Sequence, residues 1–139
     1  MIRRASADDF EAIAALSGQL GYPAAPAEMR TRLRDLLARE NHAVLVADED
    51  GVAGWIHVVE RRSLETGTFA EIAGLVVDEK RRGRKLGEKL TSAAEDWARS
   101  RGLTRMRVRS NVIRERTHAF YKRLGYEVAK TQAVFHKPL

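Results

Sequence analysis

The densest group of charged and flexible residues in this 139-residue chain is the stretch Arg81-Arg82-Gly83-Arg84-Lys85-Leu86-Gly87. An apolar run precedes it and an amphipathic run follows it, which predicts a turn between a strand and a helix. The first N–H groups of a helix have no partner inside the helix and carry partial positive charge. Glycine lets an anion approach such a backbone closely, and arginine adds charged donors. On residue type alone, the stretch favours a phosphate site and a solvated basic helix start about equally.

Two common phosphate-binding patterns do not occur in this stretch. The P-loop pattern G-x-x-x-x-G-K-[ST] fails, because Gly87 lies four residues after Gly83 and is followed by Glu88. The dinucleotide fingerprint G-x-G-x-x-G is not met either. A phosphate bound here would need another kind of backbone cradle.

The overall charge favours polyanionic partners. The formal net charge is +6 and the isoelectric point about 10.1, which suits a phosphorylated cofactor or a nucleic acid without choosing between them. Cysteine is absent, which excludes a disulfide framework, a thiolate metal site and a cysteine nucleophile. The histidines, His42, His57, His118 and His136, lack the spacing of metal ligands, so we expect no metal.

The length and hydropathy of the chain indicate one domain over residues 1–139. No apolar run reaches the length of a membrane span. Residues 1–10 lack the apolar core of a signal peptide. We therefore expect a cytoplasmic protein with no membrane partner.

Hydrophobic periodicity predicts elements in the order β-α-α-β-β-β-α-β-α-β. The expected helices cover residues 6–20, 27–40 and 86–100, with a short helix in "THAFYKRLGY" (117–126) that Gly125 stops. The expected strands cover residues 1–5, 42–48, 52–60, 69–78 and 103–110, with a closing strand pair or one bent strand over 127–139. The strands that flank the third helix should be parallel, because a helical crossover joins them. The pattern predicts a mixed sheet of the α/β or α+β class.

This order of elements, with "LVVDEKRRGRKLGEKL" after the central strand and "THAFYKRLGY" near the end, resembles the GNAT superfamily of acetyl-CoA-dependent N-acetyltransferases. The resemblance covers nearly the whole chain, and it implies a mostly antiparallel central sheet flanked by helices. The family signature Arg/Gln-x-x-Gly-x-Gly/Ala falls on residues 82–87. Arg82 and Gly87 match its ends. Lys85 stands where the family usually has glycine.

The resemblance implies how acetyl-CoA would bind. Backbone amides of residues 82–87 would hold the pyrophosphate. Leu75, Val76 and Val77 on the preceding strand would pair with the pantetheine arm as though it were another strand. A splay between this strand and residues 105–110 would admit the thioester, and a backbone N–H near Leu75 or Val76 would polarise its carbonyl.

A second match to the family is the stretch "SNVIRERTHAFYKRLGY". The resemblance adds Asn111, Arg114 and Tyr121 to the residues that bind the cofactor. The residue that matches Tyr121 often protonates the departing CoA thiolate in this family, as a phenol in a dry site can do. The alternative for Tyr121 is a core aromatic whose hydroxyl reaches a backbone group.

The general base is less well marked. The family often uses a glutamate on the central strand, alone or through water, and Glu71 lies near that place. A surface glutamate at a strand start is an equal alternative for Glu71. His57 is a second candidate for the base, because the ordinary pKa of histidine suits this role near neutrality. Without cysteine, direct attack of the amine in a ternary complex is the economical mechanism.

By resemblance, the acceptor amine would be bound by the first two helices and the hairpin strands. Tyr22, Trp55, His57 and Glu60 are the residues that these elements supply. Tyr22 and Trp55 are expected as walls of the site, or else as core residues. The stretch "QLGYP" and the last residues of the chain are similar to aminoglycoside N-acetyltransferase-like members. The acceptor stays open between a small-molecule amine and a protein amino group.

Two other functions compete with catalysis. A nucleic-acid-binding module would use the face made by Arg105, Arg107 and Arg109, although the sequence has no nucleic-acid motif. A hybrid of the two would be a basic GNAT protein directed at aminoacyl-tRNA. The other alternative is a GNAT-fold protein that senses acyl-CoA without catalysis. A homodimer is compatible with the sequence.

Overall fold

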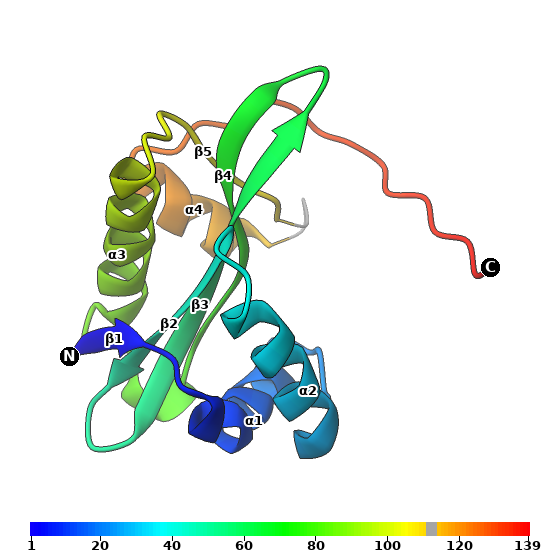
Figure 1. Ribbon diagram of the computed structural model, residues 1–139. Helices are drawn as coiled ribbons and strands as arrows, with labels where there is room; N and C mark the ends of the chain where they lie inside the picture. Colours follow the sequence, from blue (N-terminus) through cyan, green and yellow to red (C-terminus); the bar gives the residue numbers. More distant parts are fainter. Residues whose placement is uncertain (111–113) are drawn as a thin grey trace. The chain divides into compact units, whose positions relative to one another are not determined.

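The computed structural model of the protein describes residues 1–110 and 114–139 (Figure 1). The chain divides into two units, Met1–Val108 and Arg109–Leu139. The first unit contains the whole sheet, and the second contains one helix and the C-terminal segment. The expectation of a single domain over 1–139 stays a prediction.

The sheet of the first unit has five strands in the order β1-β2-β3-β4-β5. The strands are β1 Ile2–Arg4, β2 His42–Asp48, β3 Val52–Ser63, β4 Gly67–Val77 and β5 Met106–Val108. Neighbours from β1 to β4 pair antiparallel, and β5 pairs parallel to β4. This confirms the predicted mixed, mostly antiparallel sheet and the parallel pair that flanks a helical crossover.

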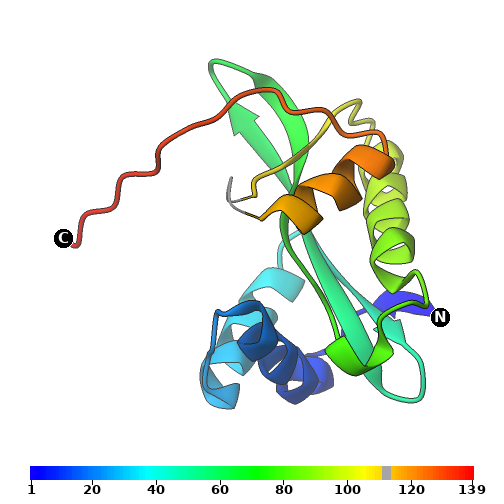
Figure 2. The same ribbon diagram turned by 180° about the vertical axis from the view of Figure 1, so that it is seen from behind.

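Helices cover both faces of this sheet (Figures 1 and 2). The first unit holds α1 Phe10–Leu20, α2 Pro26–Leu37, α3 Leu86–Ser100 and the short 3-10 turns η1 Ala7–Asp9 and η2 Glu79–Arg81. The helices α1 and α2 lie on one face, and α3 lies on the other. The predicted helix 6–20 therefore begins as a 3-10 turn, and the second helix ends three residues earlier than 40.

The core follows from the alternation of side chains along the strands. Ile13 of α1 and Leu33 of α2 pack against Val44 and Val46 of β2, with Trp55 partly buried against them. On the opposite face, α3 buries the apolar stripe expected from the sequence. Its buried residues are Leu86, Leu90, Thr91, Ala94, Trp97 and Ala98.

Charged hydrogen bonds fix the first helix to the edge of the sheet. The Arg3 guanidinium donates to Asp9 at 2.9 Å and to Asp48 at 3.0 Å. The Asp9 carboxylate also accepts from the backbone N–H of Ser6 at 2.7 Å. These contacts lower the pKa of Asp9, with the Arg3 hydrogen bond as the largest cause. They also set the start of α1, as an acidic residue near a helix N-terminus does.

The second unit contains α4 Glu115–Arg123. The helix is followed by its C-cap Leu124 and then by Gly125, whose φ of 94° is the left-handed conformation that commonly follows a helix. The strand predicted over 127–139 is wrong, because this segment is neither helix nor strand in the structure. Its β-type residues Val128, Val134 and Phe135 are exposed, and a strand forms only where another strand takes its hydrogen bonds.

None of the helices in the described part of the chain has the length and apolar character needed to cross a bilayer.

Substitution of Gly54 in β3 tests how closely β3 packs against β4 and α3. A Cβ added at Gly54 would lie 2.8 Å from the Val76 carbonyl oxygen and 3.2 Å from Leu90 Cδ1. We expect Gly54→Ala to lower the free energy of unfolding by about 1–3 kcal/mol, because backbone and core must shift. Urea denaturation measures the change.

The matched control is Gly18→Ala in α1, where an added Cβ meets nothing within 4 Å. This variant should gain up to about 1 kcal/mol, since alanine is the better helix former. Equal stability of the Gly54→Ala protein and the parent would contradict the close approach.

Candidate functional site

The turn that joins β4 to α3 holds the basic stretch. Asp78 caps η2, accepting a hydrogen bond from the Lys80 N–H at 3.1 Å. Arg82 is extended, and Gly83 takes a φ of 88°. The side chains of Arg82, Arg84 and Lys85 are exposed. The turn therefore presents cations to solvent immediately before the N-terminus of a 15-residue helix, a geometry suited to an anion.

Lys85 is the N-cap residue of α3 and has left-handed backbone angles, φ 58° and ψ 28°. Only glycine adopts this conformation without cost, and other residues lose about 1–2 kcal/mol. A left-handed residue at this place is one where glycine would be favoured. This chain carries a lysine side chain on that left-handed backbone.

The end of α1 positions the start of this turn. Gln19 donates from its amide to Asp78 at 3.4 Å and accepts from the Glu79 N–H at 3.1 Å. The guanidinium of Arg81 donates to the carbonyl of Glu49 in the hairpin turn between β2 and β3. Both ends of η2 are thereby tied to neighbouring segments of the first unit.

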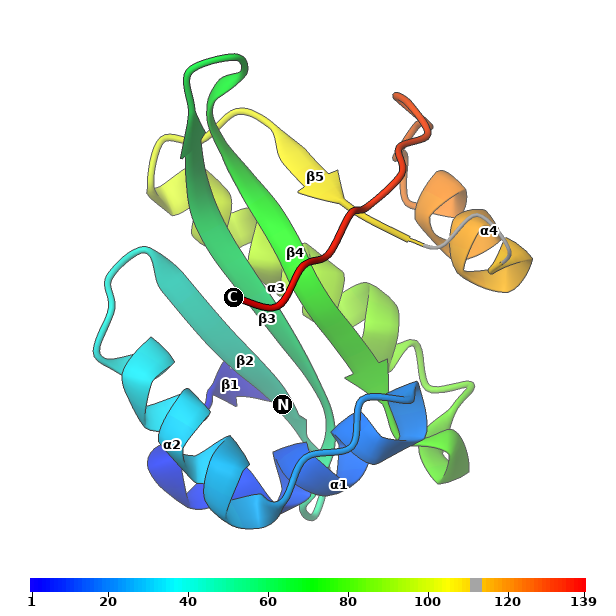
Figure 3. The same ribbon diagram turned by 90° about the vertical axis from the view of Figure 1, so that its right-hand side faces the viewer.

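The strand β4 contains a bulge at Ala73. His57 of β3 pairs with Gly74, and Val58 pairs with Ile72, so Ala73 is the extra residue. The pairing of β4 with β5 stops at the same point, at Ile72 and Val108. Among the described residues, β4 has no strand partner on this side beyond Ile72, and Figure 3 shows β5 turning away from it. A bulge of this kind bends a strand and ends pairing.

Within the described first unit, residues 73–77, which include Leu75, Val76 and Val77, therefore form a backbone edge that no strand pairs with on the β5 side. Its N–H and C=O groups on that side are available to an extended ligand, in the manner of an added strand. The basic turn follows directly after this edge in the chain. The structure therefore brings the predicted pantetheine and pyrophosphate residues together.

Glu71 lies between two arginines. Its carboxylate accepts from Arg61 Nε at 2.9 Å and from Arg107 Nε at 3.0 Å. The residue is only 5% exposed. Burial alone would raise the pKa of this carboxyl, but the hydrogen bonds from Arg61 and Arg107 outweigh it and leave the pKa below its ordinary value. Glu71 is thus an ionised carboxylate held by guanidiniums.

His57 forms a pair with His42 on the same sheet face. His42 Nδ1 and His57 Nε2 are 2.8 Å apart, and the rings stack with centroids 5.1 Å apart. Burial lowers the pKa of His57 to about 4, with added repulsion from His42 and Arg61. His57 is therefore a neutral imidazole at pH 7, and it can accept a proton or pass one to His42.

Trp55 lies beside His57, two residues along β3. An added Cβ at Gly74 would lie 2.8 Å from Trp55 Cη2, so the indole covers the bulge of β4 at this glycine. This places Trp55, His57 and Glu71 on one face, because the bulge keeps residues 71 and 74 on the same side. Trp55 also packs against the core on this face, and its expected role as a wall of the acceptor site stays a prediction.

The remaining predicted acceptor residues lie apart from this face. Glu60 is on the opposite side of β3, where it accepts from Arg62 at 3.1 Å and from Arg101, after α3, at 3.2 Å. Tyr22 follows the end of α1 and is 68% exposed. Their predicted contact with an acceptor stays a prediction.

The second unit contains Tyr121, on α4. Its ring is 8% exposed and packs edge-on against Phe120 and Tyr126, with centroids 5.1 and 5.5 Å away. Burial raises the pKa of Tyr121 to about 12, which keeps the phenol protonated. Arg114 is the exposed N-cap residue of the same helix. Asn111 lies outside the described residues.

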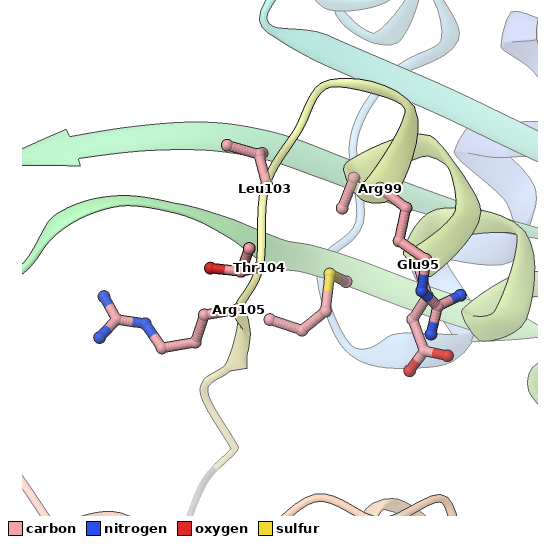
Figure 4. Close-up of a pocket in the computed structure, with 7 residues that line it drawn as sticks. Glu95, Arg99, Leu103, Thr104 and Arg105 are labelled. Carbon is pink, nitrogen blue, oxygen red and sulfur yellow. The ribbon is translucent and has the colours of Figure 1, made fainter.

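A pocket at the C-terminal end of α3 takes no part in this arrangement (Figure 4). It is lined by Glu95, Ala98, Arg99, Leu103, Thr104, Arg105 and Met106. These residues follow the basic turn by several turns of helix, so the pocket lies at the other end of α3. Separately, no set of three His, Cys, Asp or Glu side chains is placed to hold a metal ion within the described residues.

Sequence reasoning missed three contributors to the site. His42 pairs with His57 across fifteen positions, and no local pattern signals such a contact. Gln19 supports the turn from another element. Arg107 was noted only as part of a basic face, although its alternation with Met106 and Val108 already placed it opposite the buried side.

Comparison with solved structures finds the same fold. An aminoglycoside 6'-N-acetyltransferase of Acinetobacter haemolyticus is 21% identical, with 100% of this chain and 99% of that chain covered and a TM-score of 0.87. Glucosamine-6-phosphate N-acetyltransferase of Arabidopsis thaliana is 22% identical, with 98% and 97% covered and a TM-score of 0.82. AAC(6')-Iy, solved with a bisubstrate analogue of CoA, is 19% identical, with 100% and 98% covered and a TM-score of 0.88.

At these identities, the solved structures establish the fold alone. No curated protein sequence matches the chain. The sequence profile of the acetyltransferase (GNAT) family, however, matches residues 7–126, which is most of the chain and includes both the basic turn and α4. The open edge of β4, the turn into α3 and this match agree: the chain belongs to the acetyltransferase (GNAT) family, whose members transfer the acetyl group of acetyl-CoA to amines.

Proposed function

We propose that the protein transfers the acetyl group of acetyl-CoA to a primary amine by direct attack. The amine nitrogen forms a bond to the thioester carbonyl carbon, and the carbon–sulfur bond breaks. Sulfur leaves with the electron pair and gains a proton, while the amine loses one, so the products are an amide and CoA thiol. The observation that carries the proposal is the free edge of β4 beyond Ile72, which leads directly into the basic turn.

In this proposal, the backbone of Leu75, Val76 and Val77 binds the pantetheine arm of acetyl-CoA. An N–H of this edge polarises the thioester carbonyl and stabilises the charge that develops on its oxygen. The turn Arg82-Gly83-Arg84-Lys85-Leu86-Gly87 binds the pyrophosphate through backbone N–H groups and exposed cations. The family resemblance predicts that Asn111 and Arg114 also bind the cofactor.

The proton of the amine has a neutral acceptor in His57. In the tautomer in which His57 Nε2–H donates to His42, the other ring nitrogen of His57 keeps its lone pair. Glu71 is the other candidate, directly or through water. Each Glu71 carboxylate oxygen already accepts a hydrogen bond from an arginine, whereas His57 keeps one ring nitrogen with a lone pair for the amine; the pKa of both groups is lowered and does not separate them. We therefore favour His57, and the assignment of Glu71 stays a prediction.

The acceptor in this proposal is a small molecule with a primary amine. Trp55 is one wall, and Tyr22 extends the site from the end of α1. The similar solved proteins are named for aminoglycosides and for glucosamine 6-phosphate, and both are amino sugars. This supports a small amine acceptor without selecting one.

A thermal-shift comparison tests the proposal first. Acetyl-CoA at a hundred times its Kd should stabilise the protein by about 2.7 kcal/mol. Dephospho-CoA should stabilise it less, and ATP least. An acceptor panel that reads free CoA thiol then tests turnover. No stabilisation by acetyl-CoA would overturn the proposal.

Two substitutions of Lys85 separate the effect of its left-handed backbone on stability from the effect of its side-chain charge on cofactor binding. Lys85→Gly should keep the free energy of unfolding within about 1 kcal/mol of the parent, because the relief of left-handed strain offsets the entropy of glycine. Both Lys85→Gly and Lys85→Gln should raise the Kd of acetyl-CoA about three- to tenfold, because a phosphate loses a charged partner. Calorimetry measures the Kd.

The control for Lys85 is Lys89→Gln, which removes one exposed cation from the first turn of α3. We expect less than a twofold change in Kd for this variant. An equal weakening by both glutamine variants would mean that only the general charge of the turn matters, against a direct contact by Lys85.

Tyr121→Phe tests the general acid. A buried phenol with a pKa of about 12 stays protonated through the working pH range and can donate to the departing thiolate. We expect kcat to fall on the order of 100-fold with an unchanged Kd for acetyl-CoA. Tyr126→Phe, which removes a hydroxyl from a ring in contact with Tyr121, is the control. A Tyr121→Phe enzyme with full kcat would exclude the role.

Two variants test whether His57 or Glu71 is the general base. We expect His57→Gln to lower kcat on the order of 100-fold and Glu71→Gln to lower it less than tenfold. Because the pKa of His57 is about 4, protonation removes the base only as the pH falls through that value. The kcat of the parent should therefore show no acid limb from His57 between about pH 6 and 9. The reverse order of the two variants would assign the base to Glu71.

A further inference from the structure

Two arginines stack over one aromatic ring, and a third lies on the same sheet face, which also carries His57 and Trp55. The guanidinium carbons of Arg107 and Arg105 lie 4.2 and 4.9 Å from the centroid of the Phe69 ring. Arg61 is the cross-strand partner of Phe69, so the two side chains share a face. Figure 4 shows that the Arg105 side chain points away from Glu95 and Arg99.

Hydrogen bonds to neighbouring protein groups hold the side chains of these arginines in place. Glu71 accepts from Arg61 with one oxygen and from Arg107 with the other. Arg105 donates from Nη2 to the Thr66 carbonyl at 3.0 Å. Phe69 is 1% exposed, and guanidiniums stack favourably over such a ring. The three cations are therefore fixed before any ligand arrives, which reduces the entropy lost on binding.

The cluster keeps a surplus of positive charge and of donors. One carboxylate, Glu71, stands against three guanidiniums. The Arg61 side chain is 51% exposed and that of Arg107 is 30% exposed. Within the described residues, Arg61 uses only Nε in a hydrogen bond, which leaves its terminal nitrogens without a protein partner. Such paired N–H groups match the oxygens of a carboxylate or a phosphate.

The cluster lies beside the point where the acetyl group would be presented. Arg107 pairs with Glu71, one position before β4 and β5 part at Ile72 and Val108. At about 3.3 Å per residue along a strand, the backbone at Glu71, which pairs with Arg107, lies roughly 7–13 Å from residues 73–75 at the open edge of β4. That span suits a small acceptor with its amine at one end and an anionic group at the other.

We propose that the acceptor is a small amine that also carries a phosphate or carboxylate, and that Arg61, Arg105 and Arg107 bind this anionic group. The proposal rests on the acetyl transfer proposed above and narrows its substrate class. It disfavours polycationic acceptors such as aminoglycosides. On this part of the face, Glu71 is already engaged by two arginines, so a second ammonium would meet surplus positive charge.

The test compares paired acceptors in the assay for free CoA thiol. Glucosamine 6-phosphate is set against glucosamine, and 4-aminobutyrate is set against butylamine. We expect kcat/KM to be at least about tenfold higher for the anionic member of one pair, and that pair identifies the phosphate or the carboxylate. Arg61→Gln and Arg107→Gln should each reduce this ratio at least about threefold.

The matched control is Arg62→Gln, next to Arg61 in sequence but paired with Glu60 on the opposite face. This variant should leave the ratio and the activity unchanged. If the arginines only support the fold, Arg61→Gln and Arg107→Gln will lower Tm and affect both members of a pair equally. That result overturns the proposal, as does a preference of the parent for spermidine or kanamycin.

A binding measurement distinguishes failure of this proposal from failure of acetyl transfer. If no amine releases CoA thiol, calorimetry with glucosamine 6-phosphate and 4-aminobutyrate on the CoA-saturated protein still tests the arginines. Binding that Arg107→Gln weakens at least about threefold supports the anion site. An absence of binding at about 10 mM of either compound overturns it.

Discussion

The bulge at Ala73 is the constraint on which the site in the first unit depends. An extra residue in β4 shifts its register against β3 at the point where pairing with β5 ends. Had the parallel pair continued, β5 would have taken the hydrogen bonds of residues 73–77 and closed the edge. The bulge also places Glu71 on the face of His57 and Trp55. The extra residue shifts the register by one, so that Glu71 pairs with Val59, which shares a face with His57. A single irregularity thus opens the backbone and aligns the side chains beside it.

Charge is distributed unevenly around this opening. The turn after β4 exposes Arg82, Arg84 and Lys85, as suits a pyrophosphate. On the other side of the open edge, Arg107 and its neighbours surround the ionised carboxylate of Glu71 and leave a surplus of positive charge. Two separate groups of cations therefore flank the open edge, one toward α3 and one on the face of β3 to β5. Under the two proposals above, binding of anions at these groups accounts for the net charge of +6 without a nucleic-acid partner.

Much of the fold follows from local patterns. The stripe of Leu90, Ala94 and Trp97 and the turn "DEDG" are short-range signals, and they predict α3 and the β2–β3 hairpin. The bulge and the His42–His57 pair depend on register between strands, which no local pattern encodes. The prediction of a strand over residues 127–139 is wrong for the same reason. Its alternation satisfies the sequence rule, but a strand needs a partner for its backbone groups, and composition does not reveal one.

Lys85 departs from the family pattern at a position whose backbone is left-handed. Glycine is favoured there because the backbone must be left-handed, and the structure keeps that conformation with lysine. The chain tolerates a cost of about 1–2 kcal/mol at a position where a smaller residue would avoid it. Strain of this kind persists where the surrounding structure enforces it, and it gathers at ligand sites. The retained strain is an argument that the ammonium of Lys85 has a use at the phosphate end of the cofactor.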